Sequence, residues 1–340
     1  MKKIKSLIIV LLLAVLCGCG TKNTNEQIVE YFENKVNNTK SYSIKGSMEI
    51  TSNEETYSYD VLVDYKKPEM YKVTLINKIN NHEQVILKNS DGVYVVTPAL
   101  NKSFKFQSEW PNNSSQSYLL SSVLNDIKIT KNVEIKKDKE NYIVNAKVNY
   151  PNNKYLTHEL IYFDKKGNIK EVQVIKDDGR VAIKMKFVKI TYSKKFEPNN
   201  FNLDSLITTS NCEGECTTTK ETSVTDNIVY PLYLPQDTHL STKDTVESNN
   251  GDRVIMTFAG AKPFMIIEEA ATVSKEMEIT SVYGDPLQLS MSIGALSSNS
   301  LEWQSNNMQY YITSSYLTSE EMMTIAESLN TLSVAQVTNK

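Results

Sequence analysis

Beyond its first twenty residues this 340-residue sequence has no long apolar run, so it predicts no further membrane-spanning segment. Positive charge is not in excess either, since 37 Lys and Arg stand against 40 Asp and Glu. No basic stripe alternates with aromatic residues, and nucleic acid is therefore not an expected partner. Histidine is scarce, with three residues far apart in the chain, which leaves few candidates for a catalytic base. The length is enough for two domains.

Sequence motifs of common enzyme classes are missing as well. The chain contains no G-x-S-x-G, H-E-x-x-H, G-x-x-x-x-G-K-[ST] or G-x-G-x-x-G pattern. Acidic pairs such as Glu268-Glu269 are adjacent, and neighbouring residues of a strand point to opposite faces, so position alone does not make them a catalytic dyad. We therefore expect no catalytic residues, no cofactor and no bound metal ion.

The first residues form an export signal. Three lysines among the first five residues precede an apolar run at residues 7–16, which has the length of a signal-peptide core rather than of a membrane span. The run ends in Leu16-Cys17-Gly18-Cys19, which resembles the lipobox of bacterial lipoproteins. The resemblance implies that residues 1–18 are removed and that a diacylglycerol is attached to the sulfur of Cys19. The alternative is an uncleaved anchor, which the short run disfavours.

A lipid on Cys19 would hold the protein on the extracytoplasmic face of the cell membrane. Each buried methylene of an acyl chain contributes roughly 0.8 kcal/mol to such binding. Residues 19–24 form a short lipidated tether, and a chain spans at most roughly 3.5 Å per residue. We therefore expect the folded part to lie within about 20 Å of the bilayer surface.

Two cysteines remain after processing and lipidation, and both lie in a polar, threonine-rich stretch. Cys212 and Cys216 can form a local disulfide in an exported protein, and Gly214 between them permits the tight loop. Two free thiols or a redox-active pair are the alternatives. A metal site needs more ligands than this pair offers, and no histidine is near in sequence.

Apolar periodicity predicts a first unit over residues 25–205 that consists mainly of antiparallel strands. Helical spacing of Ile28, Phe32 and Val36 predicts an opening helix. From residue 41 the period changes to two, so that each segment has one apolar and one polar face, and turn residues such as Asp91-Gly92 separate the segments. The expected strands cover residues 41–50, 57–65, 71–75, 142–150, 155–163, 169–175 and 181–192.

Two details of this unit make specific predictions. Ser114 or Ser115 is expected to cap a second helix, whose apolar residues run from Leu119 to Ile127. The two helices are the candidates for covering the apolar face of the sheet. In the last strand the apolar parity switches between Phe187 and Val188, which predicts a β-bulge.

A second, smaller α+β unit is predicted over residues 228–333. It follows residues 206–227, whose many Thr, Ser, Glu and Asn side chains are typical of a linker. Thr318 and Glu321 are spaced as a capping box and predict a C-terminal helix. The expected strands cover residues 253–258, 264–268, 278–283 and 287–295.

Residues from about 25 to 203 resemble the LolA/LolB-like superfamily of lipoprotein carriers and receptors. The likeness is carried by the helix that runs directly into the first strand, by Lys67-Pro-Glu-Met-Tyr-Lys72, and by Ser90-Asp-Gly-Val-Tyr-Val95 followed by Pro98. The resemblance implies an α+β fold in which an incomplete antiparallel β-barrel is covered by helices. In the carriers the barrel encloses a cavity for acyl chains. Lys72 stands where carriers have an arginine that bonds to the lid helices, and a lysine lacks that bidentate fork.

The whole chain is similar to the YdcC-type sporulation lipoproteins of Gram-positive bacteria. This resemblance links the protein to sporulation or germination, which its composition does not. A carrier must leave its donor membrane, so a protein anchored through Cys19 is expected to have a stationary role. The residues that carry the likeness are Tyr230-Pro-Leu-Tyr-Leu-Pro235, Thr257-Phe-Ala-Gly260, Ile293-Gly-Ala-Leu296, Trp303 and the ending at residues 317–329.

Two functions fit a carrier-like fold that is fixed in place. The first is a non-catalytic scaffold that binds a protein partner at the cell envelope, as indicated by Trp303, Tyr310, Tyr311 and Tyr316, which are either exposed or part of a second core. The alternative is a protein that binds a lipid or an acyl chain in a hydrophobic cavity. The candidate lining residues, which would otherwise pack beneath the helices, are Tyr42, Ile44, Tyr59, Val61, Tyr71, Val73 and Tyr94.

We predict that the mature protein begins at Cys19 and that its sulfur carries a lipid, because the lipobox directs thioether attachment. Mass spectrometry of the N-terminal peptide from membrane fractions should detect the modified cysteine. A mature protein that is dissolved outside the cells and has an unmodified thiol at its first residue would contradict this prediction.

Overall fold

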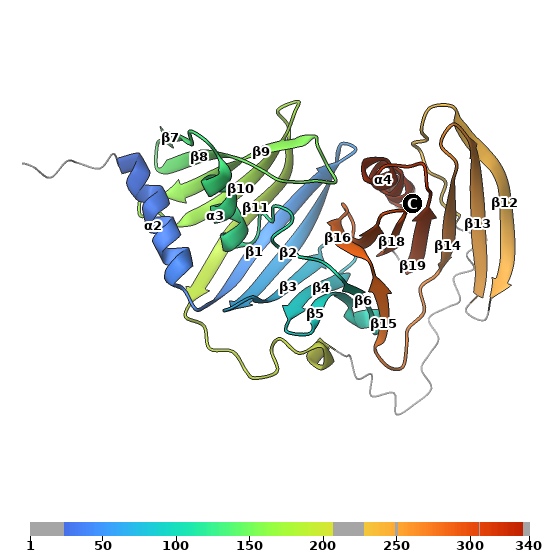
Figure 1. Ribbon diagram of the computed structural model, residues 1–340, viewed down its shortest axis with the longest axis horizontal. Coiled ribbons are helices and arrows are strands. Elements are labelled where there is room, and N and C mark those ends of the chain that lie inside the picture. Colours follow the sequence, from blue (N-terminus) through green and yellow to red (C-terminus); the bar gives the residue numbers. More distant parts are fainter. Residues whose placement is uncertain (1–23, 207–227, 249–250, 306, 336–340) are drawn as a thin grey trace, which may run out of the picture.

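The computed structural model describes residues 24–206, 228–248, 251–305 and 307–335, which are mostly β with three α-helices (Figure 1). The predicted signal peptide, Cys19 with its tether, Cys212, Cys216 and nearly all of the predicted linker lie outside the described residues. The elements of the first half are α2 (Thr24–Asn38), β1 (Ser41–Ser52), β2 (Glu55–Lys66), β3 (Met70–Asn77), β4 (Glu83–Asn89), β5 (Gly92–Thr97), η2 (Pro98–Leu100), β6 (Lys102–Phe106), α3 (Leu120–Ile129), β7 (Glu134–Asp138), β8 (Asn141–Lys147), β9 (Leu156–Asp164), β10 (Ile169–Lys176), β11 (Val181–Tyr192) and η3 (Leu203–Leu206). Those of the second half are β12 (Thr238–Ser248), β13 (Gly251–Gly260), β14 (Phe264–Ala270), β15 (Glu278–Val282), β16 (Gly284–Gln288), β17 (Ile293–Ser297), β18 (Ser300–Ser305), β19 (Met308–Thr313) and α4 (Ser319–Ala335).

Twelve strands form a large sheet in the order β15-β6-β5-β4-β3-β2-β1-β11-β10-β9-β8-β7. The sheet is open, with β15 and β7 at its two edges, and it is not closed into a barrel. Neighbouring strands are antiparallel except β15 and β6, which are parallel. The sequence did not predict this pair, in which a strand of the second half extends the sheet of the first.

Helices α2 and α3 cover one face of the large sheet (Figure 1). Phe32 of α2 packs edge-on against Phe163 of β9, with the ring centroids 5.1 Å apart. The apolar side chains of α3, including Val123 and Ile127, belong to the same core. This arrangement follows from the need to remove the apolar face of the sheet from water.

The predicted cap of α3 was wrong. The helix begins at Leu120, and no side chain caps it. Ser115 instead ties its loop to Asn149, because the N–H of Asn149 donates to Ser115 Oγ at 2.7 Å and the N–H of Ser115 donates to the Asn149 carbonyl at 2.8 Å. A serine that satisfies a neighbouring loop has the same sequence signature as an N-cap.

The predicted β-bulge is confirmed. Gly46 of β1 pairs with Phe187 of β11, whereas Lys45 pairs with Lys189, so that Val188 is the extra residue. The bulge brings the backbones close together here, since a Cβ on Gly46 would lie 2.4 Å from the carbonyl oxygen of residue 186.

Seven strands form a small sheet in the order β12-β13-β14-β19-β18-β17-β16. Helix α4 contributes Met322, Ile325 and Leu329 to its core. The predicted capping box of α4 is confirmed, because the N–H of Glu321 donates to Thr318 Oγ1 at 3.2 Å and the N–H of Thr318 donates to Glu321 Oε2 at 3.0 Å.

Residues 287–295 were predicted to form one strand and instead form a hairpin. β16 ends at Gln288, β17 begins at Ile293, and the N–H of Leu289 donates to the Ser292 carbonyl at 2.9 Å across the turn. The prediction failed because apolar residues alternate in a hairpin as they do in a strand. The turn also has no Gly, Pro or Asn that would have marked it.

This β16–β17 hairpin joins the two sheets. Its buried side chains divide between two hydrophobic cores: Met291 and Ile293 belong to the core of the large sheet, and Leu287 and Leu289 to that of the small sheet. Gln84 of β4 also bonds twice to the hairpin backbone, accepting from the Ile293 N–H at 2.6 Å and donating to the Ile293 carbonyl at 3.3 Å.

We expect Gly46→Ala to lower the free energy of unfolding by about 1–3 kcal/mol, the usual penalty for overpacking. The added methyl group would be forced against the carbonyl oxygen of β11. Chemical denaturation measures the effect, and Ser47→Ala, a half-buried neighbour in the same strand, is the matched control. Equal midpoints for the two variants would argue against a close backbone contact at the bulge.

Candidate functional site

The apolar face beneath α2 and α3 is filled by side chains. Six of the seven candidate lining residues lie in the core that these helices share with the sheet, and none of the six is more than 5% exposed. Tyr94 lies on the opposite face of the sheet, where it packs with Val96 and Phe201. None of the seven borders the cavity described next. The six residues of the helix-covered core are Tyr42, Ile44, Tyr59, Val61, Tyr71 and Val73.

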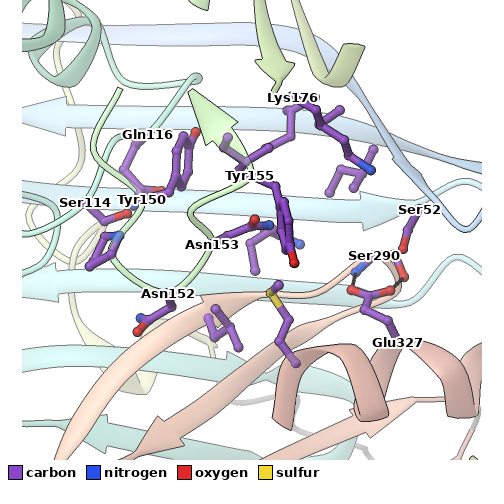
Figure 2. Close-up of a pocket in the computed structure, with 18 of the residues that line it drawn as sticks. Ser52, Ser114, Gln116, Tyr150, Asn152, Asn153, Tyr155, Lys176, Ser290 and Glu327 are labelled. Carbon is purple, nitrogen blue, oxygen red and sulfur yellow. Dashed lines mark hydrogen bonds between the residues drawn. The ribbon is translucent and has the colours of Figure 1, made fainter. Parts of the chain in front are cut away.

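A cavity of about 490 Å³ lies where the two sheets meet. Figure 2 places Ser114, Gln116 and Tyr150 at one end and Ser290 with Glu327 at the other. We call it the junction cavity. Most of its wall comes from six segments of the chain. They are the end of β1 with its turn to β2 (residues 50–53), the loop before α3 (110–118), the loop between β8 and β9 (150–156), the β10–β11 turn with the start of β11 (176–183), the β16–β17 hairpin (285–293) and α4 (323–327), each of which contributes some of its residues.

Two carboxylates hold the cavity wall together from the side of the small sheet. Glu327 of α4 accepts hydrogen bonds from the N–H of Ser290, at 2.7 Å, and from its hydroxyl. Burial raises the pKa of Glu327, although these hydrogen bonds oppose the shift. Asp285 of β16 accepts from the hydroxyl of Ser108 at 2.5 Å and from the amide of Asn113 at 2.6 Å. The hairpin is thereby fixed to α4 and to the loop before α3.

Another side of the cavity is bordered by the turn between β10 and β11. Arg180 pairs with Asp178 at 2.6 Å, and the hydrogen bond from Arg180 lowers the pKa of that carboxyl. Lys176 and Asp177 also line this side. The sequence offered no signal for the cavity, because its wall comes from segments more than two hundred residues apart.

A relative of this chain is the sporulation protein YdcC of Bacillus subtilis (strain 168). The two are 36% identical over 335 residues, which cover 97% of this chain and 98% of the relative. The chain belongs to the YdcC family of sporulation proteins.

Solved structures similar to this YdcC-family protein share little sequence with it. The complex of MucA and MucB from Pseudomonas aeruginosa has a chain that is 9% identical, with a TM-score of 0.32, over 88% of this chain and 97% of that one. An outer membrane lipoprotein-sorting protein domain from Vibrio parahaemolyticus is 11% identical, with a TM-score of 0.34, over 54% of this chain and 99% of that domain. No family model matches the chain.

Neither a membrane span nor a metal site is found in the part of the YdcC-family protein that the structure describes. No helix there is long and apolar enough to cross a bilayer. No three or more His, Cys, Asp or Glu side chains are grouped there so that they could hold a metal ion.

The aromatic residues of the second half are not an exposed cluster. Trp303 and Tyr310 are buried and stack with their ring centroids 5.1 Å apart, so the interpretation as a second core was right for them. Tyr311 is half-buried, and only Tyr316 of the four is exposed. Neighbouring aromatic residues on a strand look alike in sequence whether or not a helix covers them.

The edge strand β12 is a second candidate site. It is eleven residues long, it pairs only with β13 among the described residues, and residues 239–247 are exposed on both faces. β12 was not among the predicted strands, because a strand without a buried face shows no apolar alternation.

Two buried carboxyl groups lie at α3 and the large sheet: Asp126 belongs to α3 and Glu159 to β9. Burial raises the pKa of Asp126 to about 7. Burial, and then the charge of Asp126, raise the pKa of Glu159 of β9 well above its usual range. Neither oxygen of Glu159 has a hydrogen-bond partner among the described residues. Both groups therefore favour the protonated form in the folded protein.

We expect this pair to destabilise the protein as the pH rises. A folded-state pKa of about 7 against an ordinary 3.8 means that the stabilisation is complete below pH 3.8 and is lost as the pH passes 7, with an upper limit of about 4 kcal/mol. Thermal melts of Asp126→Asn should therefore show a smaller fall of Tm between acidic and alkaline buffer than the wild type. The exposed Glu247→Gln is the control. If Tm falls as much between acidic and alkaline buffer in D126N as in the wild type, the raised pKa of Asp126 is refuted.

Proposed function

We propose that this YdcC-family protein is a non-catalytic scaffold, anchored through Cys19 on the extracytoplasmic face of the cell membrane, that binds a protein partner at the cell envelope during sporulation. The observation that carries the proposal is the outer edge of β12, which pairs with no strand of the described residues. An unpaired edge presents a row of backbone N–H and C=O groups, to which an extended segment of another protein can add as a strand.

The other sheet edges are less suited to strand addition. β7 has five residues and carries Lys136 and Lys137, and lysines on an edge strand discourage pairing. β16 also has five residues, and it contains Pro286, which cannot donate to a ladder. β15 is equally short. β12 is twice as long as any of these, has no proline and carries a single lysine, Lys243.

The position of β12 suits a scaffold. Figure 1 shows α2 and β12 at opposite ends of the longest axis of the molecule. Helix α2 begins five residues after Cys19, so a lipid there would hold the α2 end near the membrane. The hairpin that packs in both cores keeps the small sheet in a fixed position. β12 would thus be presented away from the bilayer.

The alternative, an acyl-chain-binding protein, has less support. The space in which carriers of the LolA-like fold hold acyl chains is occupied here by side chains of α2, α3 and the hairpin. An acyl chain would need these groups to leave a closely packed core, and such a core resists rearrangement. The name of the Bacillus subtilis relative supports a role in sporulation.

We expect proline at one of two adjacent positions, Thr245→Pro or Val246→Pro, to abolish partner capture without unfolding the protein. Successive residues of an edge strand direct their N–H groups alternately toward the neighbouring strand and away from it. One substitution therefore breaks the β12–β13 ladder, and the other affects only the free edge, where proline is tolerated.

Cross-linking and pull-down from sporulating cells would measure capture, and circular dichroism would report folding. The variant that stays folded should recover at least about tenfold less partner than the wild type, which equals roughly 1.4 kcal/mol. Thr245→Val and Val246→Thr are the matched controls. Equal capture by the folded proline variant and the wild type would exclude β12 as the interface.

A further inference from the structure

The junction cavity has no part in the scaffold role, and its wall is rich in uncharged polar groups. Side-chain amides can both donate and accept hydrogen bonds without carrying charge. Such groups in a concave site fix the orientation of a polar ligand. The amides of the wall are Asn53, Asn113, Gln116, Asn152, Asn153 and Gln288.

Three of these amides have a side-chain oxygen without a hydrogen-bond partner among the described residues. Gln288 uses its NH2 group to donate to the carbonyl oxygens of Leu289, at 2.7 Å, and Ser292, at 3.3 Å. Asn113 donates to Asp285. The three oxygens belong to Gln288, Asn113 and Asn153. Buried acceptors without partners are costly. These three oxygens have almost no accessible surface, so the hydroxyl or N–H groups of a ligand would reach them only after a rotation of the amide side chains.

Aromatic residues also line the cavity. Trp110 and Tyr118 are buried, at 2% and 4% exposure, and Tyr118 is held in place because its hydroxyl donates to Gln116 Oε1 at 2.6 Å. Tyr155 also lines it and is 59% exposed, so its ring is within reach of an entering ligand. Rings of this kind pack against the C–H faces of sugars while amides bind the hydroxyl groups.

The charges of the wall disfavour an anionic ligand. Two cationic residues, Lys176 and Arg180, line the cavity together with four acidic ones. Three of the four acidic residues are already engaged, since Asp285 and Glu327 accept hydrogen bonds from the protein and Asp178 is paired with Arg180, which leaves Asp177 alone as a cation ligand. Fatty acids, nucleotides and anionic phospholipid headgroups fit this surface poorly.

We propose that the junction cavity is a binding site for a neutral oligosaccharide. Its volume of about 490 Å³ lies within the usual range for small-ligand sites. The site is built by both halves of the chain, and it is independent of β12, so a protein partner and a sugar could be bound together.

Isothermal titration calorimetry of the purified protein would test the proposal with the N-acetylglucosamine trimer and maltotriose as probes. We expect saturable binding of at least one of them. Tyr155→Ala should weaken that binding by at least about tenfold. Thr324→Trp should abolish it, because residue 324 is an exposed position on α4 that lines the cavity and the larger side chain would fill the space.

Tyr316→Ala is the matched control, because Tyr316 is similarly exposed at 64% and does not line the cavity. It should bind as the wild type does, and thermal melts would show that all three variants are folded. The proposal is overturned if neither sugar binds at millimolar concentration, or if T324W and Y155A bind as the wild type does. It is equally overturned if neither sugar binds and a fatty acid or an uncharged peptide binds in the cavity instead.

Discussion

The packing of one hairpin in two hydrophobic cores is the constraint on which the rest of this structure depends. Residues 289–296 are all buried. Met291, Ile293 and Ala295 lie in the core of the large sheet, and Leu287, Leu289 and Leu296 in that of the small sheet. The two double hydrogen bonds of Gln84 and of Glu327 fix the two sides of the hairpin. Neither sheet can bury its apolar face fully without it.

The hairpin also decides where the protein can bind a ligand. Together with α2 and α3 it fills the apolar face of the large sheet. Where the hairpin, α4 and the loops of the large sheet meet they leave the junction cavity, which is lined by amides and aromatic rings. The polar cavity lies at the junction of the two sheets, and β12 lies at the far end of the small sheet (Figure 1).

Sequence patterns were sufficient where a residue's environment depends on its near neighbours. Period-two alternation identified the buried face of β1, the parity switch at Phe187 and Val188 located the bulge, and Thr318 with Glu321 identified the start of α4. They failed where the partner of a residue is distant. Ser115 bonds to a loop and caps no helix, and residues 287–295 form a hairpin where one strand was predicted.

By itself the sequence determined a mostly β chain with three helices in its described part, and it predicts a lipid anchor at Cys19, because periodicity, caps and processing signals act over a few residues. The tertiary structure alone decided that Tyr42, Tyr59 and their neighbours lie in the core shared with α2 and α3 and do not border the junction cavity. It alone decided that β15 joins the large sheet and that a cavity forms at the junction. These features depend on contacts between residues more than 200 positions apart, such as Tyr59 with Ser290, and local apolar patterns carry no information about such contacts.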